Sequence, residues 1–493
     1  MRPRLRHPVV LVLAAALMLA LPAAAFARTG DHAPTSHSAR ATPPDAPKNL
    51  HTTVLPGQKA IEVTWDSVLL ATGYDVLVDG DVVASPLLIN PLKVVLKDGL
   101  VVGRTYEIAV RGTIGPVTGD KASTEQTLYI APVTTVQAAN PTNPLAGVEW
   151  GVYLGLQDPA MIGWNQLGQA ERDQLAPIAM AHKAKFFGRW ISDGDAEQKT
   201  KEYIEDSQAG DPSKMTILTL FRMFPWEGEA SILKRLPTPA EQAAYKKFVT
   251  GMAKGIGNDK VAVVLQPDGY FAKKAYDAFV KKLGRKKALL PARMLAWTSK
   301  TLAAQPNTEV YVDMGSEDWA RGKVAPVAKF LKLSGVKYAR GFSLNVSHKN
   351  YVEREILFAK KVSLALAKMG LPGKHAVLDT SDNGQPFHGS EINPDGSHQQ
   401  DYTMPGEIDP CKTKGEKTPC TALGIPPTTD VDNQAWHLTP AVGAVAAKYV
   451  DAYLWVSRPW LPDQGAGGSK FSPTFASLLL KTWEYSPYFA GTP

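Results

Sequence analysis

Several acidic residues stand directly after apolar runs in the second half of the chain. Asp268 follows the run VAVVLQP, Asp313 closes the run EVYVD, and Asp379 closes the run HAVLD. A β-rich run that ends in Pro and Gly cannot continue as a strand, so we expect Asp268 to lie where a buried strand reaches the surface. In a strand-and-helix barrel the chemistry is done at that end of the strands, so Asp268 is the first candidate for catalysis.

The elements that must position these residues begin at about residue 148, where apolar runs start to alternate with amphipathic segments. Repeated β-then-α order predicts a parallel sheet with right-handed crossovers, and about 340 residues favour closure into a barrel. The strand candidates are TILTLF, VAVVL, EVYVDMG, GFSLNVS, HAVLDTS and DAYLWV. Asp268, Asp313, Asn345, Asp379 and the segment after Val456 would then point to one rim. Carboxylates and aromatic residues on one rim suggest carbohydrate chemistry.

A smaller all-β domain is expected before the barrel, over residues 44–132. Its short alternating runs, separated by turn residues, are typical of a β-sandwich. The positions of Trp65, Tyr74 and Tyr106 resemble the pattern of a fibronectin type III module. We interpret these aromatic residues as core and assign the module no chemistry.

The N-terminus has the pattern of a secretory signal peptide over residues 1–27. Arg2 to His7 is basic, Val9 to Leu21 is almost wholly apolar, and small residues precede a cut after Ala27. The alternative is a membrane anchor, but this run is short, and no later segment approaches the roughly 20 apolar residues that a transmembrane helix needs. We therefore expect a secreted protein that is not bound to a membrane once the signal is removed.

Two further segments lack hydrophobic periodicity. Residues 28–43 are rich in Ser, Thr, Pro, His and Ala and predict a flexible lead. Residues 133–147 are rich in Pro and Asn and predict a linker. The barrel is accordingly expected over residues 148–493.

Composition predicts a globular protein without a nucleic-acid partner. Hydrophobic residues make up 44% and charged residues 20% of the 493 residues, a length that favours two or more domains. The formal charge of +7 includes Arg2, Arg4 and Arg6 of the predicted signal; removing these from the 54 basic residues leaves 51 against 47 acidic ones. Such a small excess gives no reason to expect nucleic acid.

The two cysteines, Cys411 and Cys420, are expected to form a disulfide that closes a small loop, since a secreted protein folds in an oxidising compartment. The alternative is two free thiols. They are too few to build a zinc site without histidines, so no metal site is predicted.

Short motifs occur in a fixed order from residue 186 to residue 459. They are FFGRW at 186–190, LQPD at 265–268, YVDMG at 311–315 followed by Trp319, GFSLNVS at 341–347, LDTSDNG at 378–384, LGIPPTTD at 423–430 and DAYLWVSRP at 451–459. In this order they resemble the motifs of glycoside hydrolase family 6, the inverting cellulases, over roughly residues 145–490. The resemblance implies a distorted α/β barrel that cuts β-1,4-glucan with inversion at the anomeric carbon and uses no cofactor.

The resemblance also assigns roles to three carboxyl groups. Asp268 matches the general acid, and the alternative is an N-cap for the helix near Phe271. Asp463 stands where the family has a candidate base, and the alternative is a surface-loop aspartate in a Pro/Gly-rich turn. Asp313 matches a site aspartate that would raise the pKa of the acid; the alternative is a turn aspartate bonded to its own backbone.

Other residues are candidates for contact with sugars. Sugar rings stack on aromatic faces, and burial in the core is the alternative for each tryptophan. Asn345 and Arg458 would bond sugar hydroxyls, with a satisfied strand-end amide and a solvated arginine as alternatives. His348 is interpreted as a surface residue. The candidate subsites are Trp190, Trp319, Trp436 and Trp455.

The chain departs from the family at several rim positions. Phe224 occupies the slot of an aspartate that supports the acid; Arg222, Glu227 or Glu229 would have to replace that support. Pro419 stands where a subsite tryptophan precedes the cysteine. Further departures are Gln266 for Glu, Ser316 for His and Asp382 for Arg.

The stretch 385–430 is long, polar and rich in Pro and Gly, so it either roofs the cleft or decorates an open groove. The sequence as a whole favours a secreted, monomeric, inverting β-1,4-glucan hydrolase that takes a polysaccharide as its partner. The first alternative is a silent polysaccharide-binding protein that kept the barrel and lost the support at Phe224. A wall or adhesion component whose β module does the work is a further alternative.

Overall fold

The computed structural model describes residues 42–55, 60–86, 92–97, 100, 105–128, 140–153, 158–164, 166–222, 235–320, 322–384, 409–416, 420–459 and 471–485. The predicted signal peptide and nearly all of the predicted lead lie outside the described residues, as do residues 133–139 of the linker.

The N-terminal part forms two antiparallel sheets. One sheet has the order β1-β2-β5 and the other the order β4-β3-β6-β7. The strands are β1 (His51–Leu55), β2 (Ala60–Thr64), β3 (Gly73–Val78), β4 (Asp81–Ala84), β5 (Lys93–Leu96), β6 (Thr105–Ile114) and β7 (Val117–Thr127).

Apolar residues from both sheets form a shared core. Ile61 of β2 and Val76 and Ile108 of the second sheet are fully buried in one cluster. Trp65 packs edge-on against Tyr74 at 5.5 Å between ring centroids. Both side chains are buried, as the sequence predicts; the likeness to a fibronectin type III module stays a prediction.

The remainder of the chain is built on one parallel sheet of seven strands, in the order β14-β13-β12-β11-β10-β9-β8. The predicted α/β barrel after a small all-β sandwich is thereby confirmed. The strands are β8 (Lys185–Gly188), β9 (Thr216–Phe221), β10 (Val261–Leu265), β11 (Thr308–Asp313), β12 (Gly341–Leu344), β13 (His375–Asp379) and β14 (Val450–Leu454).

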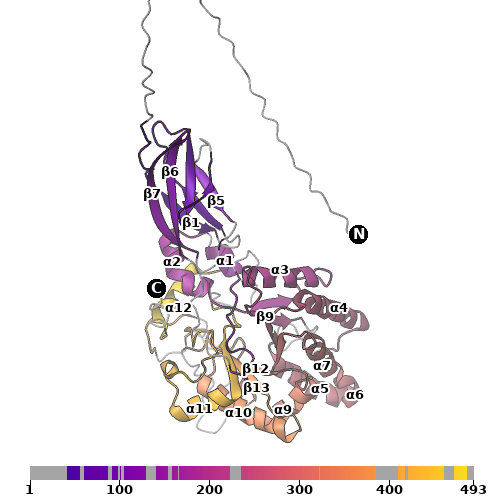
Figure 1. Cartoon of the computed structure of the whole chain (residues 1–493). Helices are drawn as coiled ribbons and strands as arrows, with labels where there is room; N and C mark the ends of the chain where they lie inside the picture. Colours follow the sequence, from indigo (N-terminus) through magenta and orange to yellow (C-terminus); the bar gives the residue numbers. More distant parts are fainter. Residues whose placement is uncertain are drawn as a thin grey trace, which may run out of the picture. The chain divides into compact units, whose positions relative to one another are not determined.

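Figure 1 shows the helices arranged around the strands of this sheet. They include α1 (Pro159–Trp164), α2 (Gln169–Ala179), α3 (Ala196–Gln208), α4 (Pro239–Ile256), α5 (Gly269–Leu283), α6 (Arg285–Ala288), α7 (Leu290–Leu302), α8 (Glu317–Ala320), α9 (Val324–Leu333), α10 (Val352–Lys368), η3 (Gln434–Trp436), α11 (Pro440–Tyr449) and α12 (Pro473–Thr482). Several begin at side-chain caps: Thr238, Thr439 and Ser472 accept backbone N–H bonds at the starts of α4, α11 and α12, each followed by a proline.

The central strand β10 shows why the sheet forms. All five residues of Val261–Leu265 are buried, as expected for a strand covered on both faces. It pairs in parallel with β9 and β11, with Val263 opposite Leu218 and Val310. Among the described residues a single parallel bridge, Lys183 with Trp455, joins the β8 side of the sheet to the β14 side.

A polar network fastens the N-terminal ends of the strands. The fully buried Asp451 accepts bonds from Arg340 Nε (2.8 Å) and Nη2 (2.9 Å) and from the Tyr311 hydroxyl (2.8 Å). His375 Nδ1 lies 2.9 Å from the same carboxylate. Asn143 Nδ2 donates to the Asp451 carbonyl at 2.7 Å, which ties residues near the end of the predicted linker to β14.

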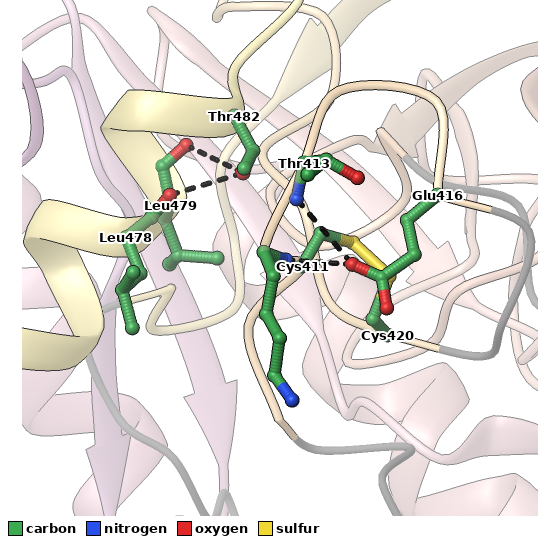
Figure 2. Close-up of a disulfide and its surroundings, with 8 residues drawn as sticks. Cys411, Thr413, Glu416, Cys420, Leu478, Leu479 and Thr482 are labelled. Carbon is green, nitrogen blue, oxygen red and sulfur yellow. Dashed lines mark hydrogen bonds between the residues drawn. A yellow bond between two sulfur atoms is a disulfide. The ribbon is translucent and has the colours of Figure 1, made fainter.

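The predicted disulfide between Cys411 and Cys420 is formed, with the two Cα atoms 5.0 Å apart. Figure 2 shows the Glu416 carboxylate inside this loop, where it accepts bonds from the backbone N–H groups of Lys412 (2.7 Å) and Thr413 (3.4 Å). Within the described ranges no helix is long and apolar enough to cross a membrane.

Candidate active site

The carboxyl ends of the parallel strands carry the candidate site. Asp268 follows β10, Asp313 ends β11, Asn345 follows β12 and Asp379 ends β13. Neighbouring strands run parallel in the order β10 to β13, so these residues share one edge of the sheet. The rim predicted from the sequence is therefore present, and its side chains differ in what they contact.

Asp268 lies at the junction of β10 and α5 in an unusual backbone conformation. Its φ is 64° and that of Gln266 is 57°, so the chain turns sharply through two non-glycine residues in the left-handed region. Its side chain makes no capping hydrogen bond to α5 within the part of the chain described. Burial raises the pKa of Asp268 to about 6, and the charge of His348 opposes that rise. The N-cap alternative thus loses its support, and the carboxyl can carry a proton at mildly acidic pH.

Asp313 holds the backbone that follows Asp268. Its Oδ1 accepts bonds from Gly269 N (2.9 Å) and Gly315 N (2.9 Å), and its Oδ2 accepts one from Ser343 Oγ (2.8 Å). Burial raises the pKa of Asp313 to about 8 against these three bonds, and the charge of Asp268 adds to the rise. The two carboxyls therefore resist being ionised together, as two nearby acids do.

The Asp379 carboxylate has a structural role, because both of its oxygens accept hydrogen bonds from neighbouring strand ends. Its Oδ1 accepts from Ser381 N (3.0 Å), Ser381 Oγ (2.6 Å) and Val456 N (3.2 Å). Its Oδ2 accepts from Ser347 N (3.1 Å), Ser457 N (2.9 Å) and Ser457 Oγ (2.5 Å). This carboxylate joins the ends of β12, β13 and β14 and fixes the rim.

Asp382 is a buried carboxyl that the sequence marked only as a departure from an arginine. The residue is 5% exposed, and its Oδ1 has no hydrogen-bond partner among the residues described. Burial raises its pKa to about 7; the charges of Lys349 and Arg458 oppose this, and that of Asp379 adds to it. A carboxyl of this kind in a predicted cleft is a candidate for a functional role.

Trp190 is the predicted subsite residue that presents its ring to solvent. It is 60% exposed, and its ring lies against Gly188, where a Cβ would meet the ring at 2.4 Å. Arg222 donates to the carbonyls of Gly188 (3.1 Å) and Ile191 (2.6 Å), on either side of Trp190. Arg222 therefore supports the turn that carries Trp190, which differs from the role at the acid considered from the sequence.

Trp319 is 5% exposed and packs beside His348 at 4.8 Å and Phe271 at 5.1 Å between ring centroids. Gly315 allows this close packing, because its φ is +76° and a Cβ there would lie 2.6 Å from the Trp319 ring. Trp319 is thus part of the rim near Asp268, mostly covered by its neighbours.

Trp436 and Trp455 lie in the core, contrary to their predicted use as sugar platforms. Trp436 is 3% exposed and Trp455 is 1% exposed. The indole of Trp436 donates to the Asp430 carbonyl, and that of Trp455 donates to the Ile425 carbonyl at 3.0 Å. Burial with a satisfied N–H makes each ring a wall residue, which is the alternative that the sequence left open.

Asn345 and Arg458 also contact protein groups. Asn345 Nδ2 donates to the Asp379 carbonyl at 3.0 Å, and its Oδ1 accepts from Asn350 N at 3.1 Å. The satisfied strand-end amide therefore describes Asn345. The Arg458 guanidinium lies 5.7 Å from the centre of the Phe186 ring. Burial lowers the pKa of Arg458, and the charges of Asp382 and Asp158 oppose this, so Arg458 is not the solvated arginine of the alternative reading.

A buried polar network stands next to these residues, and the sequence did not predict it. Ser316 Oγ lies 2.5 Å from Asp318 Oδ1 and 2.5 Å from Glu355 Oε1. His348 is 6% exposed, and its Nε2 lies 2.7 Å from Asp318 Oδ2. The interpretation of His348 as a surface residue is therefore wrong. The sequence signals that could have indicated this network are Ser316, which departs from the family, and the position of His348 just after β12.

The remaining predicted site residues fall outside the described residues. They are Asp463, Phe224, Glu227, Glu229 and Pro419, together with 385–408 and 417–419 of the long loop. Among the described residues no group of three or more His, Cys, Asp or Glu side chains could hold a metal ion.

Comparison with known proteins adds to this geometry. The chain is 27% identical over 224 residues to endoglucanase 1 of Streptomyces halstedii, which covers 45% of this chain and 64% of the relative. It is 24% identical over 246 residues to endoglucanase A of Cellulomonas fimi, covering 50% of this chain and 49% of the relative. The chain thus spans about half to two thirds of the length of these relatives.

Two solved structures match this chain along nearly their whole length. An endoglucanase from Mycobacterium tuberculosis has 23% identity and a TM-score of 0.49, covering 70% of this chain and 99% of that one. Cellobiohydrolase II from Humicola insolens has 17% identity and a TM-score of 0.49, covering 69% and 99%. The sequence model described as glycosyl hydrolases family 6 matches residues 164–474, from α1 to the start of α12. Because this family model matches more than half of the chain, the chain belongs to glycosyl hydrolases family 6.

Proposed function

We propose that this protein is a glycoside hydrolase that cuts β-1,4-glucan with inversion, and that Asp268 is its general acid. The observation that carries the proposal is the Asp268 carboxyl, which stands at the end of β10, leaves α5 uncapped and has its pKa raised to about 6. Relatives named endoglucanase support the substrate class. So does the Humicola insolens cellobiohydrolase, which was solved with glucose and cellotetraose.

In this proposal Asp268 gives its proton to the glycosidic oxygen while the bond from that oxygen to the anomeric carbon breaks. A second carboxylate activates water on the opposite face of the sugar, at about 6.5–9.5 Å from the acid in inverting enzymes. Asp463 or a chain of waters is the proposed base route. Burial keeps the proton on Asp268 by raising its pKa to about 6, while the neutral carboxyl of Asp313 accepts the Gly269 and Gly315 N–H bonds that fix the turn after Asp268.

Trp190 is the proposed platform for a sugar ring. Its exposed ring face and the support of Gly188 and Arg222 make it a rigid stacking surface. Trp319 is proposed to border the same cleft beside Asp268.

We also propose that the protein is secreted, through the signal pattern of residues 1–27, and that it acts as a monomer. The Cys411–Cys420 disulfide supports an oxidising compartment.

The second candidate is a polysaccharide-binding protein without activity. It is favoured by Phe224, which stands in the slot of the aspartate that supports the acid in the family, and by Pro419 in a subsite position.

The test compares the intact protein with Asp268→Asn on soluble β-1,4-glucan and mixed-linkage glucan, by release of reducing ends. We expect a loss of about 10²-fold or more in rate with unchanged binding in affinity electrophoresis, because general acid catalysis contributes about that much. Asp277→Asn is the matched control, since Asp277 is an exposed partner of Lys273 on the same helix. Its rate should equal that of the intact protein.

Polarimetry of the first products should show inverted anomers. Binding of both glucans without product release by the intact protein would overturn the hydrolase proposal for these substrates and favour the second candidate.

A further inference from the structure

The helices that follow Asp268 carry a strongly basic surface. Over residues 278–307 the sequence has seven basic residues and no acidic one. Taking these seven from the 54 basic residues of the chain leaves 47, which equals the number of acidic residues, so the formal excess of positive charge lies entirely in this stretch. All seven residues are exposed. We call them the basic face: Lys281, Lys282, Arg285, Lys286, Lys287, Arg293 and Lys300.

Three helices in contact bring the basic face together. Lys281 and Lys282 lie in the last turn of α5, and residues 285–287 belong to α6. Arg293 Nη2 of α7 donates to the Lys286 carbonyl at 3.2 Å, which fastens α6 to α7. α5, α6 and α7 also contact one another pairwise (Figure 1). The charges therefore belong to one surface.

The basic face has no acidic partners within the described part of the chain. Lysines on the adjoining helical surface are paired: Lys247 lies 3.2 Å from Asp193, and Lys273 lies 2.5 Å from Asp277. A surface that serves solubility alone mixes both signs of charge. The lack of acids is therefore a particular property of the basic face.

Helix-end preferences explain only part of this pattern. Lys281 and Lys282 lie at the end of α5, where the helix dipole favours cations. Residues 285–287 and Arg293 lie around the start of α7, where the dipole favours anions. Their mutual repulsion and their position both oppose folding, and an anionic partner would relieve both effects.

Aromatic rings border the basic face. Arg293, Trp297 and Lys300 are spaced i, i+4 and i+7 in α7, so they lie on one side of the helix. Trp297 is partly buried, and Lys246 Nζ lies 5.7 Å from the centre of its ring. Tyr338 is 38% exposed, and Lys300 Nζ lies 5.9 Å from the centre of its ring. The surface thus offers two rings, each with a cation beside it.

The basic face is separate from the candidate active site. α5 begins at Gly269, directly after Asp268, and Lys282 lies near its other end. A helix rises about 1.5 Å per residue, so Lys282 is about 20 Å from the start of α5. A ligand on the basic face would therefore leave the rim beside Asp268 uncovered.

We propose that the basic face, with Trp297 and Tyr338, is a second carbohydrate-binding surface, and that its ligand is an anionic polysaccharide whose sugar rings bear carboxylate groups. The sugar rings stack on the aromatic faces, and the carboxylates receive charge-assisted hydrogen bonds from the lysines and arginines. A polysaccharide is favoured over nucleic acid because the chain belongs to a family of glycosyl hydrolases. The inference goes beyond the proposed function, since it requires neither Asp268 nor cleavage of the bound chain.

The test measures the affinity of the intact protein for labelled oligogalacturonate, a chain of uronic acids, by fluorescence anisotropy. We expect binding at low salt that weakens as salt is added, because exposed charges are screened. Replacing five members of the basic face with glutamine should weaken binding by about tenfold or more, since five exposed ion pairs of modest strength add together. The substituted residues are Lys281, Lys282, Arg285, Lys286 and Lys287.

A matched control replaces five exposed lysines elsewhere with glutamine, so that both variants have the same net charge. Its affinity should equal that of the intact protein, because these lysines lie outside the proposed surface. Equal losses in the two variants would show that net charge alone attracts the ligand and would overturn the inference. The control residues are Lys48, Lys97, Lys414, Lys448 and Lys481.

The aromatic rings are tested separately from the charges. Trp297→Leu keeps an apolar side chain against the core and should weaken oligogalacturonate binding by about threefold or more, because the stacking face is lost. Tyr338→Leu is the second variant, at a more exposed ring, and should act in the same direction. Near-UV circular dichroism checks that each variant is folded. Unchanged affinity in both folded variants would overturn the role of the rings.

Two further polyanions decide which chemistry the surface recognises. Polyglutamate has carboxylates but no sugar rings, so it should bind more weakly than oligogalacturonate of similar charge. Equal affinity for the two would overturn the carbohydrate site. Tighter binding of a DNA oligonucleotide would overturn it as well and assign the surface to nucleic acid.

Asp268→Asn separates this surface from the cleft. This variant leaves the basic face unchanged and should bind oligogalacturonate as tightly as the intact protein. Weaker binding in Asp268→Asn would place the ligand in the cleft and overturn the inference. Absence of β-glucan cleavage by the intact protein would overturn the proposed function alone, because the binding measurement does not depend on cleavage.

Discussion

At Asp313 two opposing effects act on a single carboxyl group. Three donated hydrogen bonds, from Gly269, Gly315 and Ser343, favour the ionised form, whereas burial favours the neutral form. Burial prevails, because the pKa is raised to about 8. At neutral pH Asp313 therefore acts as an uncharged acceptor for the backbone N–H groups of Gly269 and Gly315 and for the Ser343 hydroxyl.

This argument predicts a difference between two substitutions of Asp313. Asp313→Asn keeps an oxygen for Gly269 and Gly315, and its amide can donate to the Ser343 hydroxyl, so we expect a loss of about 1 kcal/mol or less in the free energy of unfolding. Asp313→Ala leaves the same groups without an acceptor in the core and should cost about 3 kcal/mol or more. Urea unfolding at pH 7 measures both, and equal losses would contradict the neutral form of Asp313.

The sequence predicted the site residues unevenly, for a physical reason. Asp268 and Asp313 could be found because an acid directly after an apolar strand must reach the rim. Trp436 and Trp455 have the same residue type as Trp190, but tertiary packing covers the first two and leaves the third exposed. Whether a tryptophan offers its face depends on neighbours distant in the chain, which a local pattern does not contain.

At the scale of elements, the junction of β10 and α5 decides where Asp268 points. Gly269 begins α5, and a Cβ there would lie 2.0 Å from the Asp313 carbonyl oxygen. The close approach of α5 to β11 therefore requires glycine, and it brings Asp268 and Asp313 together.

Gly269→Ala should force α5 away from β11 and cost about 3 kcal/mol or more, the upper range for overpacking a core. The matched control is Gly284→Ala at the other end of α5, where φ is +77° and no atom lies within 4 Å of a Cβ. Only backbone strain of about 1–3 kcal/mol is expected there, because ψ is 156° and this conformation is found almost only in glycine. Urea unfolding compares the two, and a Gly269→Ala loss no larger than the control would contradict the packing argument.

The elements themselves were largely predictable. Apolar runs predicted the strands from β9 to β14, and their alternation with amphipathic segments predicted the parallel order. The network of Ser316, Asp318, His348 and Glu355 was not predictable in this way, because it depends on how α8, α10 and the end of β12 pack together. Sequence periodicity identifies which face of an element is buried and does not identify which polar groups meet there.

At the scale of the whole molecule, buried acids couple folding to pH. Burial raises the pKa of Asp313 and Glu355 to about 8 and that of Asp382 to about 7. Between about pH 4 and these values the folded state holds protons that the unfolded state has lost. Stability therefore falls as pH rises through this range, by up to about 1.4 kcal/mol per pH unit for each group.

His182 acts in the opposite direction over a narrower range, because burial lowers its pKa to about 4. The unfolded state then binds the extra proton between about pH 4 and 6.5, so this group raises stability with pH there. The acids outnumber it, and we expect the urea midpoint to fall from pH 5 to pH 8. In Glu355→Gln the fall should be shallower. A midpoint that rises over this range, or identical slopes in both proteins, would contradict this prediction.

The bridge between Lys183 and Trp455 gives the barrel a seam. Among the described residues, the backbone hydrogen bond at this seam runs from Ala184 N to the Trp455 carbonyl at 2.9 Å. Other neighbouring strands share ladders of several paired residues. Local opening of the barrel therefore costs the least free energy between β8 and β14. The Ala184 amide should accordingly exchange with solvent earlier than the amides of β10. The barrel would therefore open first between β8 and β14, at the junction of the first and last strands of its sheet.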